Sequence, residues 1–312
     1  MSILITGAGL IGCHYARRVV DSGETVVLYD LSPNQEYISK VVGKERVHVV
    51  AGDMRDLPAL MRAMSDYQAT AVVHTAGLIG SKVAQNPYTG VTINVQGAVH
   101  VLEAVAVLKL KKFIYLSSRA VYDRSKIKEG PIREDAPIGG NNFYNVTKVC
   151  SENLIHAYAQ RYELDAIIIR PGGVFGRGHY AGGSTVGMVM RELALKILEN
   201  RPFEIDTRTY FGNDYAYAKD VAKCIELAWK ANNPQQRAYN CSNGIVTTAE
   251  DIQRTVKELF DIDVKVVAQN GPQRNAFSLD LTASREQLGF VPEYPFKEAL
   301  RDYVEEMRRD PI

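Results

Sequence analysis

The sequence has few features of a metalloprotein, a disulfide-stabilised protein or a protein that binds polyanions. Its cysteines are scattered, with no CxxC pair and no histidine cluster nearby; they are Cys13, Cys150, Cys224 and Cys241. We therefore expect neither a metal site nor a disulfide framework, but buried free thiols in a reducing cytoplasm. The formal net charge is only +1, which predicts no nucleic-acid partner and no attraction to an acidic membrane surface.

Long apolar runs and a secretory signal are also missing. No run reaches the roughly 20 residues that span a bilayer, so we expect no membrane segment. The first residues, MSILITGAGL, predict a strand and a glycine turn rather than a signal peptide. Hydrophobic residues make up 46% of the 312 residues and charged residues 23%, which is typical of a globular protein with a sizeable core.

What the chain does contain is a regular alternation of two patterns. Runs rich in valine and isoleucine predict buried strands at 2–6, 25–30, 47–53, 70–77, 112–118 and 165–172. The longer stretches between them have helical periodicity. Alternating strands and helices form right-handed βαβ units, so we predict an α/β fold with a doubly wound parallel sheet of the Rossmann type.

The rhythm changes after Pro171, where seven glycines fall within residues 172–187. Dense glycine marks loops that bend sharply or allow a ligand to approach closely. Further helices are predicted at 187–200, 219–231, 248–260 and 295–309, and a strand at 263–268. We interpret 1–170 as a nucleotide-binding domain, completed by about 214–242, and 171–312 as a smaller, discontinuous substrate lobe.

The segment ITGAGLIG places Gly7, Gly9 and Gly12 in a G-x-G-x-x-G pattern directly after a strand and at the start of a helix. In this context the first glycine permits a tight turn, the second leaves room for a pyrophosphate and the third allows close packing of helix on strand. The helix N-terminus, with Leu10 and Ile11, offers free N–H groups and a partial positive charge to phosphates.

Acidic residues follow at the ends of the next strands. Asp30 ends the second strand, where a carboxylate accepts the ribose hydroxyls of NAD and repels the 2′-phosphate of NADP. No arginine or lysine follows in LSPNQ to receive such a phosphate, so we predict NAD. Asp53, followed by Met54, is placed to meet the adenine amino group, with a structural turn aspartate as the alternative. The Ala76-Gly77 turn should border the same crevice.

Four polar residues should meet in this crevice. Ser117 and Ser118 end the fifth strand, and ligands of open α/β sheets bind outside the carboxyl ends of strands. Tyr144 and Lys148 lie at the start of the following helix, four residues apart and hence on one face.

With these residues the sequence resembles the extended short-chain dehydrogenase/reductase family, also called the NAD-dependent epimerase/dehydratase family. The resemblance covers nearly the whole chain, in the glycine fingerprint, Asp30, and the segments GDMRD, VVHTAG, INVQGAVHVLEA, LSSRAVYD, YNVTK, RPGGVFGRG and, more weakly, DYAYAKDVA. It implies a catalytic set of Ser118, Tyr144 and Lys148, and implies that Pro171, Gly173 and Val174 line the nicotinamide.

The resemblance also implies how these groups act. A free tyrosine has a pKa of about 10, but a nearby ammonium and an oxidised nicotinamide favour the phenolate. Tyr144 would then exchange a proton with the substrate hydroxyl as hydride passes to or from NAD. Lys148 would also hold the nicotinamide ribose, and Ser118 would hydrogen-bond the reacting oxygen, although Ser117 remains an alternative for that role.

Several positions depart from the family pattern. The glycine loop is one residue shorter than the usual T-G-x-x-G-x-x-G. Arg119 and Ala120 stand where the family's dehydratases carry Asp-Glu, which disfavours a 4,6-dehydratase. Gly173 and Asn213 replace an asparagine and an arginine that are typical of nucleotide-sugar enzymes, so two groups expected to grip a diphosphate are missing.

These departures point to the substrate. A guanidinium near the crevice can pair with a carboxylate or phosphate. The candidate substrate-binding residues are Arg119, Arg177, His179 and Arg208. We therefore expect a small anionic polyol or a substrate like a sugar acid.

The sequence predicts an NAD-dependent dehydrogenase or reductase acting on a secondary alcohol. The alternative is an epimerase, often of the nucleotide-sugar C4 type, which keeps its NAD bound. A further alternative is a non-catalytic NAD-binding redox sensor, although such relatives tend to lose the Tyr-x-x-x-Lys pair.

By analogy with the family we expect a homodimer that packs through helices at about 92–110 and 144–162. Apolar residues wrap widely around these two helices. They include Val99, Leu102, Val105, Val107, Leu154, Ile155 and Tyr158.

Overall fold

In the computed structural model, the first six strands of the chain and the later strand β10 form a seven-stranded parallel sheet in the order β10-β6-β5-β4-β1-β2-β3. The structure describes residues 2–140, 142–178, 183–207, 210, 212–232, 234–267 and 276–310. The strands of this sheet are β1 (Ser2–Thr6), β2 (Thr25–Asp30), β3 (Val47–Ala51), β4 (Ala69–His74), β5 (Lys112–Leu116), β6 (Asp165–Pro171) and β10 (Ala238–Cys241).

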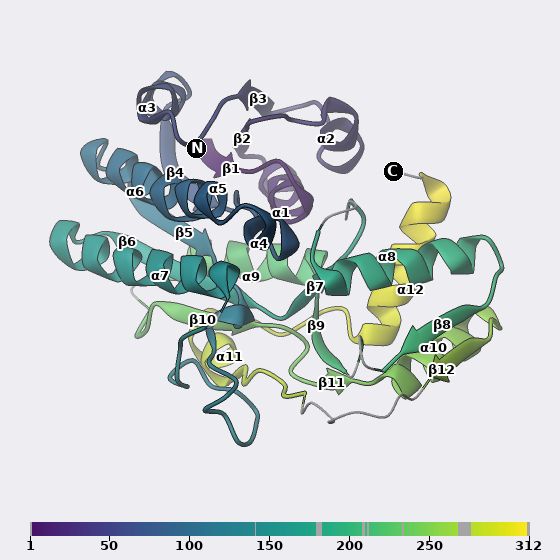
Figure 1. Cartoon of the computed structure of the whole chain (residues 1–312). Coiled ribbons are helices and arrows are strands. Elements are labelled where there is room, and N and C mark those ends of the chain that lie inside the picture. The colour runs from purple at the N-terminus through teal and green to yellow at the C-terminus, as the bar shows by residue number, and fades with distance from the viewer. Residues whose placement is uncertain are drawn as a thin grey trace.

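Helices cover both faces of this sheet (Figure 1). One apolar core joins the sheet to α1 (Leu10–Asp21), α2 (Gln35–Val41), α9 (Ala218–Lys230) and α11 (Thr282–Leu288). A second core joins the other face to α3 (Leu57–Asp66), α6 (Gly97–Val107) and α7 (Phe143–Tyr162). Because both faces are covered, the central strands are buried almost throughout, as expected for valine- and isoleucine-rich parallel strands.

The second half forms a smaller layer with its own core. It contains a three-stranded sheet, β11-β9-β7, and a two-stranded sheet, β12-β8. The strands are β7 (Gly173–Phe175), β8 (Phe203–Asp206), β9 (Asn213–Tyr217), β11 (Val246–Thr247) and β12 (Val264–Val267), and the helices are α8 (Thr185–Leu198), α10 (Ala249–Phe260) and α12 (Phe296–Arg309).

The segment 214–242 is divided between the two halves. Helix α9 packs on α1, and β10 is the edge strand of the large sheet beside β6. Strand β9 instead pairs with β7 and β11 in the smaller layer. The chain therefore crosses between the halves more than once, which makes the smaller half discontinuous in sequence.

One helical stretch is longer and more apolar than the sequence patterns indicate. Short helices α4 (Ser81–Gln85) and α5 (Pro87–Val91) lead into a π-helical turn, η1 (Thr92–Gln96), which continues into α6. By length and composition alone, Pro87–Val107 reaches the size of a membrane span, with a mean hydropathy of 1.3. This is weak support for a span, because the stretch covers one face of the sheet and the core helix of a water-soluble protein passes the same test.

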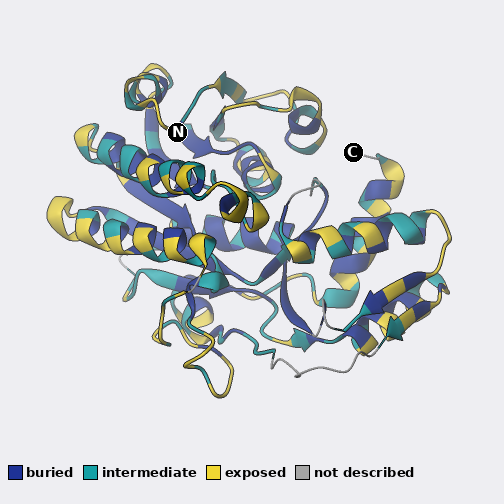
Figure 2. Ribbon diagram, viewed as in Figure 1, coloured by how far each residue is buried: buried dark blue, intermediate teal, exposed yellow. Residues whose placement is uncertain are grey.

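Exposure varies along α6 and α7, the two helices expected to form a dimer interface (Figure 2). Leu102, Val105 and Ile155 are fully buried in the fold, so of the apolar residues on these helices they serve the sheet rather than a partner subunit. Val99, Leu154 and Tyr158 are half-buried, and Val107 is exposed.

The four cysteines are free thiols. Cys13, Cys224 and Cys241 are buried, but Cys150 is exposed on α7, contrary to the expectation that all four are buried. Among the described residues there is no cluster of three or more histidine, cysteine or acidic side chains that could hold a metal ion.

Candidate active site

A large cavity in the described part of the chain, about 1490 Å³ in volume, lies where the parallel strands end. The ends of β1, β4, β5 and β6 border it, and the N-terminal part of α8 borders it from the smaller half. The strand order reverses beside β1, and a crevice at such a point is the usual ligand site of an open α/β sheet.

The three glycines of the first loop serve different purposes. Gly7 has a φ of 89°, and a Cβ on it would lie 2.8 Å from the backbone nitrogen of Ala76. A Cβ on Gly12 would lie 1.9 Å from the carbonyl oxygen of Gly7. A Cβ on Gly9 would meet no protein atom within 4 Å, so this position opens onto the cavity. Gly7 and Gly12 are therefore needed for packing, whereas Gly9 leaves space for a ligand.

Asp30 connects this loop to the second strand. Its carboxylate accepts hydrogen bonds from the backbone N–H of Ala8 at 2.8 Å and of Ser32 at 2.8 Å. Each oxygen keeps a further lone pair, and the side chain borders the cavity. Asp53 also borders it, but its carboxylate is paired with Arg55, whose hydrogen bonds hold the pKa of Asp53 below its ordinary value.

These groups fit NAD. The α1 N-terminus has no acidic side chain in its first turn, and its amides at Leu10 and Ile11 border the cavity beside Gly9. Such free amides bind a pyrophosphate, and the spare lone pairs of Asp30 match two ribose hydroxyls. Met54, Ala76 and Gly77 border the same region, as the sequence predicts.

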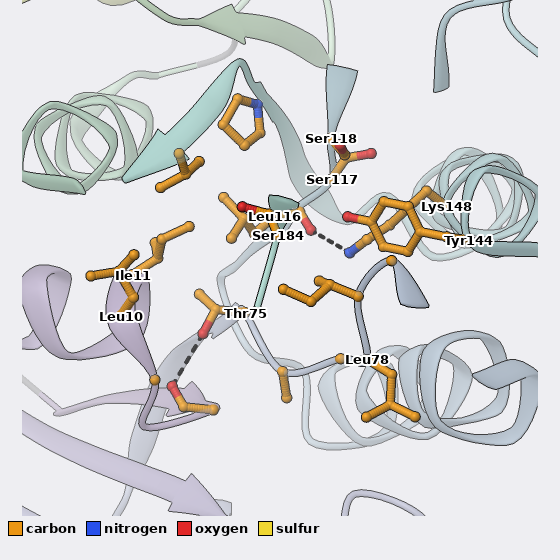
Figure 3. Close-up of a pocket in the computed structure, with 18 of the residues that line it drawn as sticks. Leu10, Ile11, Thr75, Leu78, Leu116, Ser117, Ser118, Tyr144, Lys148 and Ser184 are labelled. Atoms are coloured by element: carbon orange, nitrogen blue, oxygen red, sulfur yellow. Dashed lines mark hydrogen bonds between the residues drawn. The ribbon is translucent and has the colours of Figure 1, made fainter. Parts of the chain in front are cut away.

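Tyr144, Lys148 and Ser118 meet on the opposite wall of this cavity. Figure 3 shows Tyr144 and Lys148 extending side by side from α7, with Ser118 nearby at the end of β5. Ser118 caps the short 3₁₀ helix η2 (Arg119–Val121), and its Oγ accepts the N–H of Ala120 at 3.1 Å. Its hydroxyl proton is not donated to any described residue and is available to a substrate oxygen.

Lys148 is buried beneath Tyr144. Its Nζ donates to the carbonyl oxygen of Leu116 at 2.8 Å and lies 4.7 Å from the centre of the Tyr115 ring. Burial lowers the pKa of Lys148, while the nearby Tyr144 and Glu152 oppose this shift. The remaining N–H donors of the ammonium are free to bind ribose hydroxyls.

The surroundings of Ser117 argue against the alternative that it supplies the active hydroxyl. It borders the cavity, but its hydroxyl donates at 2.5 Å to the buried carboxylate of Glu152. Glu152 in turn forms a buried ion pair with Arg170, with Nη2 and Oε2 2.6 Å apart. The Ser117 hydroxyl is thus engaged inside the fold, so Ser118 is the serine that can serve the substrate.

Asn94 anchors the wall between these groups. It lies in η1 and is buried; its side chain accepts the N–H of Leu78 at 2.8 Å and donates to the carbonyl oxygen of Leu78 at 2.9 Å and to Thr147 at 3.1 Å. The π-helical turn therefore ties the loop after β4 to α7. These contacts give Asn94 a positioning role.

Pro171, Gly173 and Val174 also border the cavity, on the side of the smaller half. A Cβ on Gly173 would lie 3.0 Å from both side-chain polar atoms of Asn213. The two positions that depart from the nucleotide-sugar pattern are therefore in contact: the missing side chain at 173 leaves the space that the Asn213 amide fills.

The arginines predicted to bind substrate differ in their surroundings. Arg119 borders the cavity and is half-buried. Arg177 does not border it: its guanidinium pairs with Asp310 at 2.6 Å, and its carbonyl oxygen accepts the hydroxyl of Tyr37 at 3.1 Å. Arg177 is therefore a structural residue, because the chain after β7 turns toward the C-terminal helix. His179 and Arg208 lie outside the described residues.

Sequence reasoning missed several residues of the cavity wall. They include Leu31, Leu78, Lys82, Tyr122, Ser184 and Arg191. Only Ser184 and Arg191 carry a usable signal, since they flank the start of a helix that follows the glycine-rich loop. The others reach the cavity through the path of loops that have no distinctive pattern.

Comparison with known proteins agrees with this geometry. Residues 3–242 match the family described as "NAD dependent epimerase/dehydratase family". UDP-glucose 4-epimerase 2 of Oryza sativa subsp. japonica is 29% identical over 341 aligned residues, which cover 96% of this chain and 80% of that protein.

Two solved structures share the fold. UDP-glucose 4-epimerase of Thermotoga maritima with UDP-glucose has a TM-score of 0.85 at 23% identity, and the match covers 99% of each of the two chains. UDP-glucuronic acid 4-epimerase of Bacillus cereus has a TM-score of 0.82 at 22% identity, also with 99% coverage of each chain. The chain belongs to the NAD-dependent epimerase/dehydratase family, and it is an NAD-dependent enzyme of that family.

Proposed function

We propose that this enzyme is an epimerase that uses tightly bound NAD to invert a secondary alcohol of a sugar nucleotide. The observation that carries the proposal is the meeting of Ser118, Tyr144 and Lys148 with the glycine loop on one cavity. Its volume of about 1490 Å³ leaves room for a substrate beside a dinucleotide. The similar rice protein is a UDP-glucose 4-epimerase, which supports this class of substrate.

Each protein group has a defined task. Bound NAD supplies a hydride acceptor and donor at the substrate carbon. Tyr144 takes the proton from the reacting hydroxyl and returns it, and the positive charge of Lys148 stabilises the negative charge that develops on the Tyr144 oxygen. Ser118 donates a hydrogen bond from its free hydroxyl to the reacting oxygen and so holds that oxygen in place.

A second candidate is the net dehydrogenase of a small anionic polyol or sugar acid. It is favoured by Gly173 and Asn213, which replace two residues that grip a diphosphate in nucleotide-sugar enzymes, and by Arg119. Arg119 and Ala120 also supply no acid and base pair for eliminating water, so we expect no dehydratase activity.

The test compares Tyr144→Phe with the native enzyme on UDP-glucose and on a panel of sugar acids and polyols. We expect turnover to fall by about 10²–10⁴-fold, because proton transfer is lost, with NAD affinity little changed. The matched control is Tyr158→Phe, on the same helix, whose hydroxyl contacts Glu103 rather than the cavity.

Two readouts distinguish the candidates. An epimerase produces an inverted hydroxyl, seen by NMR, with no net reduced nicotinamide, whereas a dehydrogenase releases NADH that is seen by its absorbance. Full turnover by Tyr144→Phe would reject Tyr144 as the acid and base in both candidates, whereas a native enzyme that binds NAD but converts no substrate of the panel would leave only a dinucleotide-binding protein.

We also propose a homodimer that packs through α6 and α7. The two helices lie side by side on one face of the sheet (Figure 1). Exposed apolar side chains remain along this face and the adjoining α5, among them Val91, Val107 and Val146.

A further inference from the structure

A second, smaller pocket opens beside the catalytic serine. It has a volume of about 130 Å³ and is lined by Arg119, Thr185, Val189, Tyr210, Gly212 and Asn213, together with Val186. We call it the side pocket. Arg119, Thr185 and Val186 border both the side pocket and the main cavity, so the two spaces adjoin directly next to Ser118. The side pocket is too large for a single water but suits one small polar group.

Two buried polar atoms in the side pocket have no partner. The hydroxyl of Tyr210 and the Oδ1 atom of Asn213 are buried without a hydrogen bond, and these two residues are only 4% and 5% exposed. Leaving a buried polar group unpaired costs about 1–3 kcal/mol. Such groups persist at sites where a ligand completes their hydrogen bonds.

Arg119 brings a positive charge to the side pocket, and the buried Asp214 lies near enough to attract it. The Arg119 guanidinium forms no hydrogen bond or ion pair with any residue that the structure describes, and Asp214 behind it is already occupied by Leu279, Ser242 and Gly244. The N-terminus of α8 adds free amides at Thr185 and Val186, with no acidic side chain in its first turn. A helix N-terminus with an unpaired guanidinium favours an anion.

We propose that the side pocket binds an anionic substituent of the substrate that is carried next to a hydroxyl group. Arg119 and Tyr210 donate to the anion, and Asn213 accepts from the hydroxyl. This inference rests on the proposed function, because it names a substrate feature recognised at the same site. The anion is either a carboxylate on the sugar or a phosphate of the nucleotide, since both present oxygen acceptors to a guanidinium.

The experiment measures binding to the NAD-loaded enzyme by calorimetry. The probes are UDP-glucose and UDP-glucuronic acid, which differ by a carboxylate on the sugar, together with free glucuronate and inorganic phosphate. The variants are Arg119→Gln and Tyr210→Phe. The matched control is Arg191→Gln, because Arg191 borders the main cavity but not the side pocket.

If the anion is a sugar carboxylate, Arg119→Gln lowers the affinity for UDP-glucuronic acid by about 10- to 100-fold and the affinity for UDP-glucose much less. If the anion is a phosphate, Arg119→Gln lowers the affinity for both nucleotide sugars and for inorganic phosphate together. Tyr210→Phe keeps the ring packing and shifts affinity in the same pattern by a smaller factor, so it serves as the test if Arg119→Gln does not fold.

The proposal is overturned if Arg119→Gln and Tyr210→Phe bind every probe as well as Arg191→Gln does, or if no anionic probe binds the native enzyme. Binding needs no turnover, so the result is separate from the proposed reaction. An enzyme that binds these probes through Arg119 but converts none of them contradicts the proposed function and supports the side pocket.

Discussion

At the scale of single residues, burial keeps one histidine near Lys148 in its neutral form. His74 ends β4 and is only 1% exposed, with its Nδ1 2.6 Å from the hydroxyl of Thr6 and its Nε2 unpaired. Burial, and to a lesser extent the charge of Lys148, lowers the pKa of His74 to about 3. A neutral imidazole at this position avoids placing a second positive charge near Lys148.

This shift predicts acid sensitivity. The unfolded chain binds a proton at His74 near its ordinary pKa of 6.5, whereas the folded chain does so only near 3. Between these values the unfolded state holds more protons, so the free energy of unfolding falls as the pH falls, by up to about 1.4 kcal/mol per pH unit. We expect His74→Asn to show a shallower slope in urea unfolding between about pH 4 and pH 7.

The matched control is His48→Asn, because His48 is exposed and lies away from the cavity. It should keep the native slope. Equal slopes for the native protein and His74→Asn would show that other groups cause the acid sensitivity.

At the scale of elements, the substrate side of the cavity depends on how β7 and β9 pack. The two strands pair in parallel, with Gly173 opposite Tyr215, and the Asn213 amide occupies the space next to Gly173. This chain has glycine at 173 where the family pattern has asparagine, and asparagine at 213 where the pattern has arginine. Because the two side-chain positions are in contact, we interpret these two departures as one coupled change rather than as two separate losses of a diphosphate-binding group.

A double-mutant cycle tests this coupling. In Gly173→Ala the new methyl group lies 3.0 Å from the Asn213 amide and from Val186, so we expect a loss of about 1–3 kcal/mol in the free energy of unfolding. Combining it with Asn213→Ala should relieve the crowding, with a coupling energy of about 0.5–2 kcal/mol.

Gly9→Ala is the control for this cycle. Its methyl group meets no protein atom within 4 Å, so stability should be unchanged while NAD affinity falls. Strictly additive losses in the cycle would show that Gly173 and Asn213 act independently.

At the scale of the whole molecule, the two halves are held together around the cavity. Asp310, after α12, pairs with Arg177 at 2.6 Å and with Lys40 of α2 at 3.0 Å. The end of the chain therefore lies beside the nucleotide-binding half, as Figure 1 shows. These contacts align the wall that carries Arg119 and α8 with the wall that carries the glycine loop.

The proposed dimer is tested by its mass. Light scattering should give twice the 34.7 kDa of one chain. Ala157 is exposed on α7, and Ala157→Arg should shift the protein toward the monomer, because it places a charge in a buried apolar interface. Glu305→Arg, exposed on α12, is the control. A native protein with the mass of one chain would remove the dimer from the proposal.

Local pattern was enough for the parts of the fold that repeat. The strands at 2–6 and 25–30 have the bounds that their apolar runs predict, and β3, β4 and β5 end only two or three residues early. The glycine loop, Asp30 and the Tyr-x-x-x-Lys spacing likewise identify their region, because phosphate binding and proton transfer require these residue types at these separations.

The sequence by itself determined the sheet, the glycine loop and the helix that carries Tyr144 and Lys148, since each depends on residues close together in the chain. Only the tertiary structure decided that Ser117 faces Glu152 while Ser118 faces the cavity, that Arg177 pairs with Asp310, and that Arg119 meets Tyr210 and Asn213 in one pocket. These outcomes depend on partners roughly 35 to more than 100 residues away, because the direction of a side chain is set by the charge and space it meets after the chain has packed.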